Sequence, residues 1–357
     1  MPHGFLRFGA TGLARNDYCF ERSALTVRCC RASYRTALTG ASAFAALLMV
    51  LVSLTPVYAA WPDRPLRVVV GSSAGGGGDI LARTLAPRLN EALGQPLVVD
   101  NRGGAAGAIA CEIVARAVPD GHTLLLASVG MLAINPGLYP KLLYAPLRDF
   151  RPVTMLAAAP YVLVVNPNVA AKSVRELIAL AASKPGGMNF ASGGTGTGNH
   201  FSGELFKLLA GVELVHVPYK GTGPALTDVL AGQVQIMFSN LLPTMPHVKA
   251  GRLRARAVTS AQRSPSAPEL PSVGEALPGY ATTVWHGLLL PVGAPPAVAA
   301  RLHREVTAIL REPEIKSRLA AQGTDTVGNS SEEFTAVIRE ETQKWAKVIA
   351  RAGVKAE

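Results

Sequence analysis

Two glycine-rich turns carry the residues whose types and spacing could bind an anion. They are residues 71–79 and 192–199, and each follows a short apolar strand and leads into an amphipathic helix. The first N–H groups of a helix lack partners within the helix, and the helix dipole is positive there. Neither turn contains Lys or Arg. Amides and hydroxyls without a fixed countercharge favour a small carboxylate, bound reversibly, over a nucleotide triphosphate bound with a metal.

The hydroxyl and glycine residues of these turns are the candidate ligand-binding residues. Hydroxyls donate hydrogen bonds to a carboxylate, and glycines allow the backbone to approach closely. For each turn taken alone, a flexible loop without a ligand is the alternative. Asp79 either caps the helix that follows or contacts the ligand, and Tyr219 faces either a cleft or solvent. The full candidate set is Ser72, Ser73, Ala74, Gly75, Gly76, Asp79, Ser192, Gly193, Gly194, Thr195, Gly196, Thr197 and Tyr219.

Other kinds of site are poorly supported by the motifs. Neither turn has the Lys of a phosphate-binding loop or the spacing of a dinucleotide fingerprint. The histidines and cysteines lack metal-ligand spacing. A secreted hydrolase that uses Ser192 and His200 is the alternative from another functional class, although Ser192 is not in a Gly-x-Ser-x-Gly turn. We therefore expect no catalytic residue, no metal site and no cofactor.

Residues 1–60 are expected to be a signal peptide. Three arginines precede an uncharged, largely apolar run over 37–60, which ends in small residues. We expect export to the periplasm and cleavage after Ala59 or Ala60. The alternative is an uncleaved membrane anchor, because the run is long enough to span a bilayer. Three of the four cysteines lie in this leader, so the mature chain keeps only Cys111 and forms no internal disulfide.

Charge and length limit the partners of the mature chain. The 357-residue chain has a formal charge of +11, and the leader contributes six Arg and two acidic residues, which leaves +7. Basic residues are not interleaved with aromatic ones, and no nucleic-acid motif is present, so we expect no nucleic-acid partner. No mature segment is apolar over a membrane-spanning length. We expect a soluble, two-domain monomer rather than a larger assembly.

Apolar strands alternate with amphipathic helices along the mature chain, which predicts α/β units with largely parallel sheets. Ser173 with Glu176 and Ser330 with Glu333 are potential capping boxes, and Gly353 is expected to end a long terminal helix. The predicted strands are 66–70, 97–99, 123–127, 161–165, 188–191, 214–217, 234–238 and 285–290, and the predicted helices are 79–93, 106–117, 173–183, 200–210 and 223–231.

The chain is expected to pass twice between two lobes. Strands 161–165 and 285–290 are flanked by prolines at the points where one α/β series gives way to the next. Two such crossings would form a two-stranded hinge, and closure about a hinge buries a small ligand. The predicted lobes are 61–161 with 283–357, and 162–282.

With these motifs placed, the chain resembles the Bug family, the periplasmic receptors of tripartite tricarboxylate transporters. The resemblance runs from Trp61 to near the C-terminus. It is carried by Ala74-Gly-Gly-Gly-Gly-Asp79, Val99-Asp-Asn-Arg102, Pro119-Asp-Gly-His-Thr123, Asp149-Phe-Arg-Pro-Val153, Ser192-Gly193, His216-Val-Pro-Tyr-Lys-Gly221, Ala231-Gly-Gln-Val234, Pro271-Ser-Val-Gly-Glu275 and Trp285-His-Gly287.

The resemblance implies a type II periplasmic-binding-protein fold that closes over a small carboxylate. It also implies that the loops matching 72–79 and 192–197 hold the ligand, mainly through backbone amides, hydroxyls and water. At 71–73 this chain has Gly-Ser-Ser where the family commonly has a proline and an aromatic residue. One apolar wall of the pocket is therefore expected to be missing, which favours a more polar or wider ligand.

The function that we expect is capture of a small organic carboxylate and its delivery to membrane subunits of a tripartite tricarboxylate-type transporter. A receptor that reports its ligand to a sensor kinase would have the same fold and the same kind of site. The sequence does not separate these two roles, and it does not identify the carboxylate.

Overall fold

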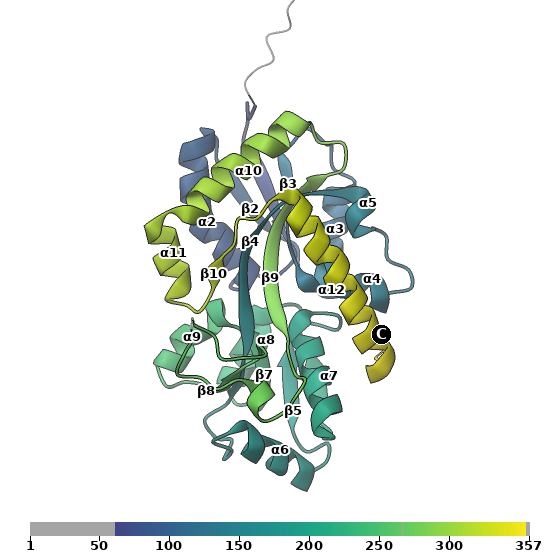
Figure 1. The fold of residues 1–357 in the computed structure, drawn as a ribbon, viewed down its shortest axis with the longest axis vertical. Helices are drawn as coiled ribbons and strands as arrows, with labels where there is room; N and C mark the ends of the chain where they lie inside the picture. The colour runs from purple at the N-terminus through teal and green to yellow at the C-terminus, as the bar shows by residue number, and fades with distance from the viewer. Residues whose placement is uncertain (1–60, 266, 355–357) are drawn as a thin grey trace, which may run out of the picture. The chain divides into compact units, whose positions relative to one another are not determined.

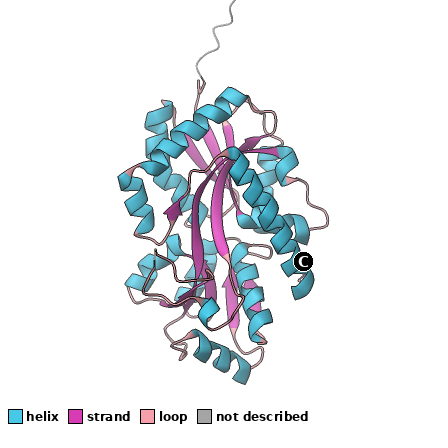
Figure 2. Ribbon diagram, viewed as in Figure 1, coloured by secondary structure: helices cyan, strands magenta, loops and turns pink. Residues whose placement is uncertain are grey.

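The computed structural model describes residues 61–265 and 267–354. Their strands form one ten-stranded sheet, in which eight strands follow the order β2-β1-β3-β9-β4-β7-β5-β6 while β8 and β10 pair with β4. Helices lie on both sides of these strands (Figure 2), as α/β units require. The predicted signal peptide and its cleavage site lie outside the described residues.

The first α/β units form a parallel group of strands. β1 pairs in parallel with both β2 and β3. Parallel neighbours need a crossover connection, and helices supply it here. The elements are β1 (Leu66–Val70), α2 (Gly77–Leu93), β2 (Leu97–Asn101), a 3₁₀ turn (Ala105–Gly107), α3 (Ala108–Ala115), β3 (Thr123–Ser128), a π-helical segment (Gly130–Ile134) and α4 (Asn135–Leu138).

A second parallel group comes from the middle of the chain. β5 pairs in parallel with both β6 and β7. Helices again connect the strands of this group. Its elements are α6 (Val174–Ser183), β5 (Asn189–Ser192), α7 (Gly198–Ala210), β6 (Val215–Pro218), α8 (Thr222–Leu230), β7 (Ile236–Asn240), α9 (Leu241–Lys249) and β8 (Arg254–Val258).

Two antiparallel strands connect the groups. β4 (Phe150–Val165) pairs with β9 (Thr283–Pro291) through residues 150–160 and with β7 through residues 161–165. The two strands run side by side in Figure 1, and β9 also pairs with β3. The mixed α/β fold agrees with the predicted class, whereas the predicted lobe boundaries stay a prediction. The remaining elements are α5 (Pro146–Asp149), α10 (Pro296–Arg311), α11 (Pro313–Ala320), β10 (Asp325–Thr326) and α12 (Ser331–Ala352).

The length of β4 is a correction to the sequence analysis. We expected a short strand at 161–165 flanked by prolines, but one strand covers Phe150–Val165 and includes Pro152 and Pro160. Pro152 lies beside a register shift in the pairing with β9, and Pro160 lies in the last pair before β4 turns to β7. Proline lacks a backbone donor and is tolerated where ladder pairing is irregular.

The predicted capping residues are confirmed. The Ser173 hydroxyl accepts from the Glu176 N–H, and Ser330 with Glu333 forms a full capping box. Gly353 ends α12 with φ of 63°, a conformation that glycine adopts without strain. The described helices include none with the length and apolar content needed to cross a bilayer.

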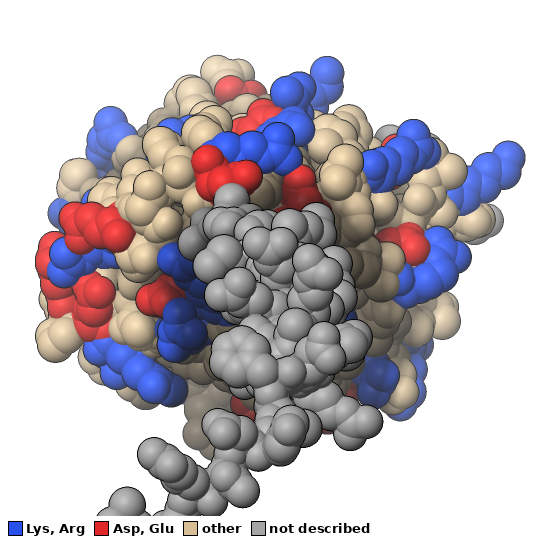
Figure 3. All heavy atoms as spheres, turned by 90° about the horizontal axis from the view of Figure 1, so that it is seen from above, with Lys and Arg blue, Asp and Glu red and all other residues tan. Residues whose placement is uncertain are grey.

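Charged side chains of both signs are interspersed on the face shown in Figure 3. Ion pairs among the described residues include Arg88 with Glu312 at 2.9 Å and Arg263 with Glu275 at 2.9 Å. Because these side chains are substantially exposed, solvent screens the pairs and they add little to stability. Burial of apolar side chains around the central strands is the larger source of stability.

Candidate functional site

One cavity is bordered by the starts of two helices. Gly77 and Gly78 of α2 line it from one side, and Gly198 and Asn199 of α7 line it from the other. The cavity has a volume of about 60 Å³, which is room for a few water molecules. The lining is Val70, Gly71, Ser72, Gly77, Gly78, Gly104, Ala106, Gly107, Leu126, Ser128, Met131, Tyr161, Gly193, Thr197, Gly198, Asn199, Gly221, Thr222, Asn240, Val284 and His286.

The start of α2 presents uncapped amides to this cavity. Its N-cap residue is Gly76, which has no side chain to accept the N–H groups of the first turn. Asp79 instead turns back to the loop: one carboxylate oxygen accepts from Gly75 N at 2.9 Å, and the other pairs with Arg83 Nε at 2.8 Å. Asp79 therefore shapes the loop, and the N–H groups of Gly77 and Gly78 stay available to a ligand.

The second loop uses many of its own amides internally. Gly193 N donates to Asn199 Oδ1 at 3.3 Å, and Gly194 N donates to Ser192 Oγ at 3.1 Å. The Thr197 hydroxyl caps α7 by accepting from the backbone N–H of its third residue. From this part of the chain the cavity is lined by Gly193 and Thr197 of the loop and by Gly198 and Asn199, the first two residues of the helix.

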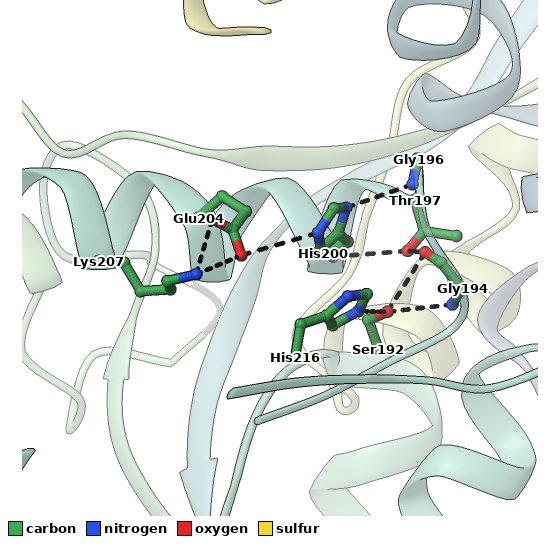
Figure 4. A network of polar contacts seen from close by, with 8 residues as sticks. All are labelled: Ser192, Gly194, Gly196, Thr197, His200, Glu204, Lys207 and His216. Carbon is green, nitrogen blue, oxygen red and sulfur yellow. Dashed lines mark hydrogen bonds and ion pairs between the residues drawn. The ribbon is translucent and has the colours of Figure 1, made fainter. Parts of the chain in front are cut away.

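Two stacked histidines support the second loop (Figure 4). His216 Nε2 lies 2.6 Å from Ser192 Oγ, and the ring of His200 stacks on that of His216 with 4.0 Å between centroids. His200 Nδ1 accepts from the backbone N–H of Gly196 at 3.3 Å. That nitrogen carries no proton, so the other ring nitrogen of neutral His200 carries the hydrogen and points toward Glu204, whose nearest oxygen lies 3.7 Å away.

Burial keeps both of these histidines neutral. Desolvation, helped by His216 and Lys207, lowers the pKa of His200 to about 3. Desolvation and Lys207 lower the pKa of His216 to about 4. Glu204 does not offset these effects, because it is paired with Lys207 at 2.9 Å.

The hydrolase alternative requires a pair that the structure does not form. Ser192 hydrogen-bonds to His216, not to His200, and its side chain is fully buried. Ser192 does not line the cavity. A nucleophile must reach the substrate, so this arrangement serves loop support better than attack on a carbonyl.

The floor of the cavity consists of two pairs of residues on neighbouring strands. Ser128 of β3 lies directly opposite His286 of β9, and Tyr161 of β4 lies directly opposite Asn240 of β7. Directly opposed residues project to the same face of a sheet, and all four line the cavity. Within the described part of the chain, their side-chain polar atoms have no hydrogen-bond partner, so each can bind a ligand or water.

Some predicted residues border the cavity and others lie behind it. Ser72, Gly193 and Thr197 are in the lining, and the buried Ser72 hydroxyl has no partner within the described residues. The Tyr219 hydroxyl donates to Asp228 of α8 at 2.6 Å. Burial and that contact raise the pKa of Tyr219 to about 12. The predicted residues outside the lining are Ser73, Ala74, Gly75, Gly76, Asp79, Ser192, Gly194, Thr195, Gly196 and Tyr219.

The cavity has an electrostatic character that limits its ligand. Its lining, all of it within the described residues, includes no Asp, Glu, Lys or Arg. Two helix starts supply about half a positive charge each, and the floor supplies neutral donors. An anion with one or two carboxylates matches this distribution, whereas a cation would find no countercharge.

Comparison with known proteins places the chain among solute receptors. The family model described as tripartite tricarboxylate transporter family receptor matches residues 81–354. Protein BugT of Bordetella pertussis is 37% identical over 297 residues, which cover 83% of this chain and 91% of BugT.

Two solved structures from Rhodopseudomonas palustris are similar over nearly their whole length. Rpa4515 with adipate has a TM-score of 0.81 at 36% identity, covering 83% of this chain and 99% of that one. MatC with bound malate has a TM-score of 0.78 at 32% identity, covering 81% and 100%. These likenesses agree with the predicted periplasmic-binding-protein fold. The chain belongs to the receptor family of the tripartite tricarboxylate transporters, to which the Bug proteins belong.

Proposed function

We propose that this protein is a periplasmic receptor that captures a small dicarboxylate without chemical change and delivers it to a tripartite tricarboxylate-type transporter. The observation that carries the proposal is the pair of helix starts that open into one cavity. Gly77 and Gly78 border it on one side, and Gly198 and Asn199 border it on the other.

The chemistry of the site supports a carboxylate as the ligand. Each helix start offers N–H donors and a positive dipole end to an oxyanion. The Ser72 hydroxyl adds a buried donor that lacks a partner among the described residues. With no Lys or Arg in the lining, binding stays reversible, as delivery to a second protein requires.

The relatives support a ligand with two carboxylates. Rpa4515 was solved with adipate and MatC with malate, and both acids have a carboxylate at each end. Helix starts on opposite sides of the cavity offer one anion site to each end of such a ligand. Membership of a transporter-receptor family and the predicted signal peptide support export and delivery.

The test is calorimetric titration of the purified protein with adipate, malate, citrate, aspartate and benzoate. We expect saturable binding of at least one dicarboxylate. Gly198→Ala should abolish this binding, because the added Cβ would lie 2.0 Å from the Tyr161 hydroxyl and displace the phenol. Gly187→Ala, which adds the same methyl group outside the cavity, should bind normally. Absence of binding by every acid would overturn the proposal.

Receptor and hydrolase are separated by a second assay. The purified protein and Ser192→Ala are incubated with ester substrates, and product release is followed. We expect none from either protein, because Ser192 is buried behind the cavity. Turnover that disappears in Ser192→Ala would contradict the assignment as a receptor.

A further inference from the structure

A histidine deep in the cavity is the feature that the proposed function leaves unused. His286 is 8% exposed, and it also borders a smaller cavity behind β4 and β9. Its ring lies beside the start of α2, because a Cβ on Gly78 would lie 3.5 Å from His286 Cδ2. A Cβ on Gly77 would lie 2.5 Å from Asn240 Nδ2. The amides of α2 and these two side chains therefore converge on one end of the cavity.

The opposite end has a different set of groups. The start of α7 lies against Tyr161, since a Cβ on Gly198 would lie 2.0 Å from its hydroxyl oxygen. A ligand with two carboxylates would place one against Gly198 and Tyr161 and the other against α2, Asn240 and His286. The two ends differ in one respect: the α2 end has an imidazole, which can take up a proton when an anion binds beside it.

We propose that His286 binds one carboxylate of a dicarboxylate ligand and takes up a proton as it does so. The inference rests on the proposed function and specifies it further. Proton uptake supplies a positive charge in a cavity whose lining includes no Lys or Arg. His286 is then a specificity-determining residue, which favours a second carboxylate over an apolar tail at this end.

The surroundings of His286 permit this protonation. Burial alone lowers the pKa of His286 to about 4, so the ring is neutral. Tyr161 is the other ionisable side chain lining the two cavities within the described residues. On α2, Asp79 is paired with Arg83 and faces the loop. No charged side chain therefore competes with the ligand for His286.

The size of the effect follows from the contact. At an effective dielectric constant near 20, a carboxylate at about 4 Å raises the proton affinity of an imidazole about 1,000-fold. The half charge at the start of α2 opposes this, but it is smaller than the full charge of a carboxylate. We expect binding of a dicarboxylate to tighten about tenfold between pH 8 and pH 6.

The experiment measures proton uptake by calorimetric titration at pH 7 in two buffers that differ in ionisation enthalpy. Adipate, malate and hexanoate are compared, the last being a monocarboxylate of the length of adipate. We expect proton uptake with the dicarboxylate that binds and none with hexanoate. His286→Gln keeps hydrogen-bonding groups but cannot take up the proton, so its uptake and pH dependence should disappear. His247→Gln, outside the cavity, should behave as the unaltered protein.

The outcomes separate the two proposals. Dicarboxylate binding without proton uptake, or uptake that persists in His286→Gln, would overturn the role of His286 and leave the receptor function standing. Tighter binding of hexanoate than of any dicarboxylate would overturn the role of His286 and the preference for dicarboxylates, and would leave a receptor for monocarboxylates. Failure of the unaltered protein to bind any acid from pH 6 to pH 8 would overturn both. If His286→Gln does not fold, the comparison of adipate with hexanoate still decides the question.

Discussion

Acid should destabilise this protein through His200, and replacing that residue should remove part of the effect. His200 is 3% exposed, stacked on His216, and its Nδ1 is committed to the Gly196 amide. Its pKa is about 3 in the folded chain, against 6.5 for a solvated histidine. Between these values the unfolded state binds more protons than the folded state, so stability falls as pH falls from about 6.5 to about 3.

The magnitude follows from those two values. At pH 5 an unfolded histidine is almost fully protonated, whereas His200 in the folded chain is almost fully neutral. The difference lowers the free energy of unfolding by about 2 kcal/mol relative to pH 8. His286 has the same direction of shift and adds to the loss.

The assay is urea unfolding at pH 8 and pH 5, followed by tryptophan fluorescence. The loss of stability between the two pH values should be about 2 kcal/mol smaller in His200→Gln than in the unaltered protein. Leu89→Ala is the matched control: it removes buried apolar contacts and should cost about 2 to 5 kcal/mol equally at both pH values. A loss in His200→Gln equal to that of the unaltered protein would refute a neutral, buried His200.

Three further predictions concern stability and the site. Trp345→Ala should lower the free energy of unfolding by about 3 to 5 kcal/mol in urea melts, because the fully buried indole packs edge-on against Phe201 and donates to Glu341. Ser330→Ala should cost about 1 kcal/mol in the same assay by removing the N-cap of α12, and a cost near zero would contradict that role. Gly77→Ala should weaken dicarboxylate binding measured by calorimetry, because the added methyl group would overlap the side-chain amide of Asn240 and displace it.

Much of the fold could be predicted because its signals are local. The strand 66–70 is predicted to the residue. Ser173 and Ser330 cap the starts of their helices, and Gly353 caps the end of α12, as expected. Each of these features depends on residues within one or two turns of chain. The length of β4 could not be predicted the same way. Pro152 is tolerated because the pairing with β9, a strand distant in sequence, shifts register beside it.

The site was predicted at the level of its two loops, not of its floor. Ser72, Gly193 and Thr197 border the cavity, and the glycine and hydroxyl pattern is the local signal that points to them. Ser128, His286, Tyr161 and Asn240 were missed. They meet because of cross-strand register, which no local pattern encodes. The motif Trp285-His-Gly287 drew attention to one of them without indicating its role.

Hydrogen bonds inside the second loop are the other feature that the sequence concealed. Its glycines suggest amides free to bind a ligand, but Gly194 and Gly196 donate to Ser192 and His200. The amides that we propose to bind the ligand are therefore those at the helix start. His200 at the helix start and His216 on a neighbouring strand support this loop, and no sequence pattern indicated that they would do so.

A ¹H–¹⁵N NMR titration of the purified protein with adipate and malate tests directly whether the two helix starts bind the ligand. We expect the amides of Gly77, Gly78, Gly198 and Asn199 to shift most, with their protons moving downfield as a carboxylate accepts from them. Saturable shifts confined to amides elsewhere, with these four unmoved, would contradict the claim that the two helix starts bind the ligand.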